Sequence, residues 1–87
     1  MFRIEDEAHA ETVGEYPERD SAMAELRRLA GLPWDREPNQ APCSNWQGCG
    51  RRYELIEYDP AAEYLRELRR SLVLTISAGG AIWHSER

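Results

Sequence analysis

The stretch from Trp34 to Gly50 constrains this chain most, because it is seventeen residues long and follows neither a helical nor a strand-like period. It contains two prolines, two asparagines, two glycines and both cysteines of the chain. Loops of this length are uncommon in compact domains, and they are often functional or cross-linked. We therefore expect any functional site to lie in or beside the long loop at residues 34–50.

The length of the chain limits it to one small domain. It has 87 residues, so a single domain over residues 1–87 is expected. The longest uncharged apolar stretch, at residues 72–83, is far shorter than the roughly 20 residues of a membrane-spanning helix. Three acids among the first seven residues stand where a secretion signal would have its apolar segment. The sequence therefore predicts a cytoplasmic protein that does not contact a membrane.

The charge of the chain is uneven. Residues 1–42 carry five arginines and ten acids, whereas residues 43–87 carry six of each, so the formal net charge of −5 lies in the first half. Proteins that bind nucleic acid usually present a basic face to the phosphate backbone. A nucleic-acid partner is therefore not expected.

The first half of the chain predicts a hairpin followed by a helix. Apolar and charged residues alternate over residues 2–5, as in half-buried strands. Residues 8–10 interrupt this pattern, and a weaker alternation resumes over residues 12–16, where Gly14 is suited to a bulge. Residues 18–30 then place apolar side chains at helical spacing, with acids at the start and arginines at the end. Gly31 is expected to close this helix in a left-handed conformation, and Pro33 prevents its continuation.

The second half predicts three more strands and a second helix. Aromatic and branched residues favour a strand over residues 52–58. Asp59 followed by proline suits a helix start, and apolar spacing predicts a helix over residues 60–69. Strands follow at residues 72–76 and 81–84. The expected fold is α+β in the order β-β-α-loop-β-α-β-β, a small antiparallel sheet of about four to five strands with the helices packed on one face.

The two cysteines, Cys43 and Cys49, allow three interpretations. Zinc needs four ligands, usually at two-to-four-residue spacing, and the only histidines lie in the terminal segments, so no metal site is predicted. An oxidisable thiol pair is favoured by the positive charge of Arg51 and Arg52 next to Cys49. Alternatively, both residues could pack in the core as small hydrophobic side chains.

The histidines offer no recognisable catalytic arrangement in the sequence. His9 lies in the turn of the predicted hairpin and His84 lies near the C-terminus, and neither has an evident carboxylate or nucleophile as a partner. No pair of carboxylates is placed in an apolar pocket that would separate their pKa values. No catalytic residue, cofactor or enzymatic activity is therefore expected.

One run of residues resembles a known family. The run from Cys43 to Arg51 contains a Cys-x5-Cys-Gly-Arg pattern, and Pro33-Trp34 precedes it. With Glu57-Tyr58-Asp59, residues 65–70 and residues 76–78, it resembles a family of small uncharacterised bacterial proteins, over residues 20–83. That family has no assigned function, so the resemblance implies a shared domain and no catalytic residue.

We therefore expect a non-enzymatic cytosolic domain that binds another protein or a second copy of itself. Tryptophan and arginine are enriched among the residues that contribute most to protein interfaces. The candidate contact residues in and beside the long loop are Trp34, Trp46, Arg51 and Arg52. The alternative is a thiol-redox or metal-binding protein that uses Cys43 and Cys49.

Overall fold

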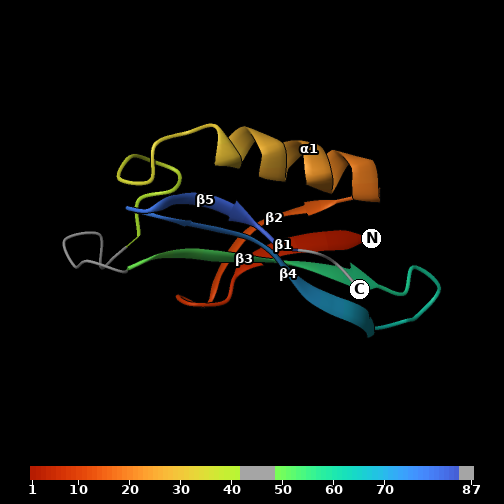
Figure 1. Ribbon diagram of the computed structural model, residues 1–87. Coiled ribbons are helices and arrows are strands. Elements are labelled where there is room, and N and C mark those ends of the chain that lie inside the picture. The colour runs from red at the N-terminus through yellow and green to blue at the C-terminus, as the bar shows by residue number, and fades with distance from the viewer. Residues whose placement is uncertain (42–48, 85–87) are drawn as a thin grey trace.

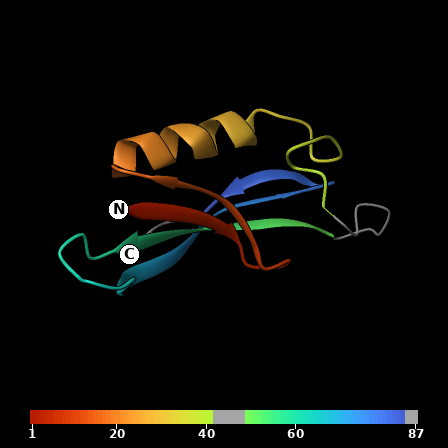
Figure 2. The same cartoon turned by 180° about the vertical axis from the view of Figure 1, so that it is seen from behind.

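The described part of the chain forms a five-stranded antiparallel sheet with one helix across one of its faces (Figures 1 and 2). The computed structural model describes residues 1–41 and 49–84. Its elements are β1 (Phe2–Asp6), β2 (Glu11–Tyr16), α1 (Arg19–Ala30), β3 (Gly50–Tyr58), β4 (Glu67–Ser77) and β5 (Gly80–Trp83). The order of strands in the sheet is β2-β1-β3-β4-β5, and each neighbouring pair is antiparallel.

The predicted α+β class, with helices packed on one face of the sheet, is wrong. Over the described residues, the structure is mostly an antiparallel sheet with a single short helix. The second helix, predicted over residues 60–69, does not form. Residues 59–66 instead make the loop that joins β3 to β4, and β4 already begins at Glu67. The loop lies at the opposite end of the sheet from the segment that follows α1 (Figure 1).

The second helix fails because its apolar stripe has nothing to pack against. Tyr64, Leu65 and Leu68 are 74%, 59% and 51% exposed. An isolated helix of about ten residues is marginal in water without tertiary packing. Pairing with β3 instead satisfies the backbone from Glu67 onward, and the Arg70 side chain contacts carboxylates on both strands. The strand ladder therefore prevails over the local helical pattern.

The predicted hairpin at residues 2–16 is confirmed as β1 and β2. Ile4 pairs with Gly14 and Glu5 pairs with Thr12, so Val13 is an extra residue on β2. This one-residue offset is a β-bulge, located beside the glycine that suggested it.

The predicted helix at residues 18–30 is confirmed as α1. Glu18 is its N-cap residue, and the Ser21 hydroxyl accepts a hydrogen bond from the Glu18 backbone N–H. Gly31 does not close the helix in the left-handed conformation, because its φ is −88°. No helix in the described part of the chain is both long and apolar enough to cross a membrane.

The hydrophobic core lies between α1 and the sheet. Strand residues alternate between the two faces of a sheet, and the buried alternate positions of β1, β3 and β4 face the helix. The core side chains are Ile4, Ala22, Leu26, Leu29, Tyr53, Leu55, Val73, Leu74 and Ile76.

On the sheet face opposite α1, the described residues form several ion pairs. Arg3 contacts Glu15 at 2.7 Å, and its guanidinium lies 5.1 Å from the centre of the Tyr58 ring. Arg70 contacts Glu54 at 2.8 Å. Ile56 is paired in register with both arginines, and it is fully buried. Long arginine side chains can cover apolar surface with their methylene groups while the charges stay in water.

Candidate functional site

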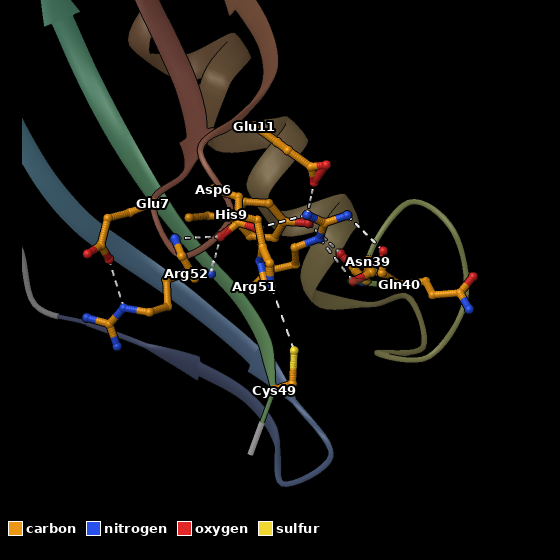
Figure 3. Close-up of polar contacts among 11 residues, drawn as sticks. Asp6, Glu7, His9, Glu11, Asn39, Gln40, Cys49, Arg51 and Arg52 are labelled. Carbon is orange, nitrogen blue, oxygen red and sulfur yellow. Dashed lines mark hydrogen bonds and ion pairs between the residues drawn. The ribbon is translucent and has the colours of Figure 1, made fainter. Parts of the chain in front are cut away.

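The site is formed where the turn between β1 and β2 meets the start of β3 (Figure 3). The antiparallel register of β1 and β3 places Asp6 opposite Tyr53. Cys49 directly precedes β3, and the turn at residues 7–10 directly follows β1. Pairing of the two strands therefore brings His9 to Cys49, although forty residues separate them in sequence.

Asp6, His9 and Cys49 form a continuous chain of contacts. His9 Nδ1 lies 2.6 Å from Asp6 Oδ2, and His9 Nε2 lies 3.7 Å from the Cys49 Sγ. Cys49 is disulfide-bonded and half-buried. The other cysteine of the chain, Cys43, lies outside the described residues. The imidazole therefore joins a carboxylate on one side to a sulfur on the other.

Asp6 is the buried anchor of this chain. Its side chain is 1% exposed, and it accepts hydrogen bonds from the backbone N–H groups of Ala8 and Arg52 at 3.1 and 3.0 Å. Burial by itself would raise the pKa of the Asp6 carboxyl, but hydrogen bonds from Arg51, from Arg52 and from His9 outweigh burial and bring the pKa below its usual value. An ionised carboxylate can only accept, so the Nδ1 of His9 carries a hydrogen and its Nε2 is directed at Cys49.

Arg51 ties the same carboxylate to the segment that follows α1. Its Nη1 donates to Asp6 Oδ2 at 2.8 Å and also to Glu11. Its Nε donates to the carbonyl oxygen of Asn39 at 3.2 Å, and its Nη2 donates to that of Gln40 at 2.7 Å. All three nitrogens of the guanidinium are thus used within the fold.

The Asn39 side chain caps the C-terminal end of α1, although Asn39 lies outside the helix. It is 1% exposed, and its Nδ2 lies 2.8 to 3.4 Å from three carbonyl oxygens, those of Leu29, Leu32 and Pro33. Its Oδ1 accepts a hydrogen bond from the Tyr53 hydroxyl at 3.0 Å. Burial raises the pKa of that hydroxyl to about 12, so Tyr53 remains a donor at neutral pH. Asn39 thus replaces the left-handed glycine predicted for this helix end.

A pocket of about 400 Å³ opens beside Cys49. Its polar lining comes from the β1–β2 turn, from the start of β3 and from the end of β4 together with the residue after β5. The Nε2 of His84 lies 3.2 Å from the Thr75 hydroxyl. The polar lining residues are His9, Cys49, Arg51, Arg52, Thr75, Ser77 and His84.

The three described candidate contact residues do not gather on one surface. Trp34 is partly buried and packs against the core, and the Arg51 side chain is only 11% exposed. Arg52 is 51% exposed and contacts Glu7 at 2.8 Å. Trp46 lies outside the described residues. The structure therefore directs two of the three described candidates inward.

The sequence pattern did not identify the residues that lie beside the Cys49 sulfur. His9 had no evident carboxylate partner, yet Asp6 stands three residues before it and contacts it. The alternation over residues 2–5 predicted a strand, but it could not show which other strand would pair with it. Within residues 1–41 and 49–84, no group of three or more His, Cys, Asp or Glu side chains could hold a metal ion.

No family model, characterised protein or solved structure matches this chain. The resemblance to small uncharacterised bacterial proteins therefore stays a prediction.

Proposed function

We propose that this chain is a thiol–disulfide redox domain in which the Cys49 sulfur is the reacting atom. The observation that carries the proposal is the line of contacts from Asp6 through His9 to the Cys49 sulfur. A thiolate is the reactive form of cysteine, and a nearby histidine or arginine favours it. His9 is placed to accept the proton of a Cys49 thiol when the disulfide is reduced.

The carboxylate gives His9 a defined role. A histidine whose Nδ1–H is held by a carboxylate presents a basic Nε2 to its other neighbour, and the imidazolium that forms on proton transfer is stabilised. Arg51 compensates the negative charge of the buried Asp6 carboxylate, so this charge does not have to be stabilised by solvent. Reduction of the disulfide would place a thiol proton within reach of a fixed base.

The expected location supports a working disulfide. Disulfides in the cytosol are usually transient and serve catalysis or redox sensing, whereas secreted proteins use them to hold the fold. We propose a cytoplasmic location together with the redox role. The expectation that the chain is not an enzyme stays a prediction, and a sensor that is oxidised and reduced once per signal would agree with it.

The test is the pH dependence of thiol labelling. In reduced protein carrying Cys43→Ser, we expect Cys49 to react with iodoacetamide at pH 7 about tenfold faster than in the same protein with His9→Gln, equivalent to about one pKa unit. His84→Gln is the matched control, because His84 lines the same pocket but contacts Thr75. Identical rate profiles for the parent and the His9→Gln protein would contradict the proposal.

Protein binding or self-association also stays a prediction. Neither Trp34 nor Arg51 belongs to the apolar side chains that are most exposed among the described residues. They include Ile82 and Trp83, which are 56% and 45% exposed on β5, a strand at the edge of the sheet. A partner surface is better supported there than at Trp34, which packs against the core, or at Arg51, whose side chain is 11% exposed.

A further inference from the structure

We infer, on the basis of the redox function proposed above, that the pocket beside Cys49 selects small thiols that carry a carboxylate. The pocket has a volume of about 400 Å³, within the range of sites for small molecules. The chain contains 16 acids, yet none is among the described residues that line this pocket. Its charged and titratable lining consists of two arginines and two histidines, and the Cys49 sulfur lies beside them.

Arg52 is the residue suited to hold the carboxylate. Its Nε donates to Glu7 at 2.8 Å, and within the described residues its two terminal nitrogens have no hydrogen-bonding partner. A guanidinium fork matches a carboxylate better than a point charge does. Arg51 cannot take this role, because all of its nitrogens are used inside the fold.

The geometry also places the reacting sulfur and the anion-binding residue on one cavity. Arg52 pairs in register with Thr75, and Gly50, which follows Cys49, pairs with Ser77. Paired residues share a face of the sheet, so Arg52 and the hydroxyls of Thr75 and Ser77 line the same wall. A bound carboxylate would thus lie near enough to direct its own thiol to Cys49.

The reaction requires two small thiols. A thiolate attacks the Cys49 Sγ, the disulfide bond breaks, and its electron pair leaves on the sulfur formerly bonded to Cys49, which takes a proton from water. A second thiolate attacks the outer sulfur of the mixed disulfide and releases Cys49 as a thiolate beside the His9 imidazole, and this thiolate takes its proton from water. One protein disulfide and two thiols thus become one dithiol and one small disulfide.

The experiment compares how fast three thiols reduce the oxidised protein: 3-mercaptopropionate, 2-mercaptoethanol and cysteamine, which are anionic, neutral and cationic. Each rate is divided by the rate of the same thiol with a small neutral disulfide, which removes differences in intrinsic reactivity. We expect the anionic thiol to be favoured over the cationic one about three- to fivefold. The net charge of −5 would by itself favour the cationic thiol, so this preference has to come from the pocket.

Arg52→Gln is expected to abolish the preference for 3-mercaptopropionate. Arg27→Gln, which removes the same charge from an exposed position on α1, is expected to keep it. Equal normalised rates for the three thiols in the wild-type protein would overturn the selectivity and leave the redox function standing. Failure of all three thiols to reduce the protein would overturn the redox function as well.

Discussion

Replacing Asp6 with alanine is expected to lower the free energy of unfolding by about 3–5 kcal/mol. The variant removes a buried carboxylate that accepts hydrogen bonds from two backbone N–H groups, from His9 and from Arg51. It also leaves the Arg51 guanidinium, whose side chain is 11% exposed, without its buried counter-charge. Removing one partner of a buried ion pair costs far more than the pair itself contributes. Denaturant unfolding of the oxidised protein measures the loss.

Glu15→Ala is the matched control for this variant. Glu15 is also an acid of the β1–β2 hairpin and also contacts an arginine, Arg3, but its side chain is 50% exposed. Exposed ion pairs contribute at most about 1 kcal/mol, so its loss is expected to be small. Equal losses for Asp6→Ala and Glu15→Ala would show that Asp6 is not the anchor of the site.

The contribution of Asp6 is also expected to depend on pH in the acid range. Because its pKa in the folded protein is lower than in the unfolded chain, its stabilising effect is present above about pH 4 and is lost as pH falls through the folded value. The difference in stability between the wild-type protein and Asp6→Asn should therefore shrink below pH 4. A difference that stayed constant in acid would contradict the ionised state assigned to Asp6.

Asn39→Ala is expected to lower the free energy of unfolding by about 2–4 kcal/mol. The substitution leaves the carbonyl oxygens at the end of α1 and the buried Tyr53 hydroxyl without the partners that Asn39 gives them. Each unpaired buried polar group costs about 1–3 kcal/mol. The effect should appear as a lower denaturation midpoint with an unchanged slope.

Gln40→Ala controls for this position. Gln40 is the next residue and has an exposed side chain, and it contributes its backbone carbonyl oxygen to Arg51, which alanine retains. Its substitution is expected to change stability by no more than about 0.5 kcal/mol. If Asn39→Ala were equally mild, the segment after α1 would not depend on the Asn39 contacts.

The elements that could be predicted from sequence have strong local signals. The hairpin alternates apolar and charged residues over two strands, and α1 combines an apolar stripe with terminal charges of the favourable sign. Residues 60–69 had the same kind of helical pattern, but Tyr64 and Leu65 remain exposed. The residues from Glu67 onward pair with β3 instead of forming a helix. A local pattern does not reveal which tertiary partner is available.

The site depends on contacts that no local pattern encodes. Cys49 was recognised as a candidate from its place in the long loop, but the approach of His9 follows from the pairing of β1 with β3. Asn39 likewise acts on carbonyl groups seven to ten residues before it and on a tyrosine in another strand. The spacing of residues along the chain could suggest Cys49 as a candidate. Its neighbours could be identified only from the order of the strands in the sheet.

Asp6 links the stability of the fold to the chemistry of the site. One of its oxygens receives both the Arg51 guanidinium and the His9 imidazole, and the other receives two backbone N–H groups. The same carboxylate that secures the start of β3 thus orients the base beside Cys49. Any change at Asp6 is expected to affect both the unfolding free energy and the reactivity of Cys49.

The reduction potential of the Cys49 disulfide tests the redox role most directly. Structural disulfides have reduction potentials below about −300 mV, whereas labile, catalytic or regulatory ones lie above it. Equilibration of the intact protein with defined ratios of reduced and oxidised dithiothreitol or glutathione, followed by mass analysis, gives the potential. We predict a value less negative than about −300 mV. A value more negative than this would show that the disulfide only holds the fold, and it would contradict the redox role of Cys49.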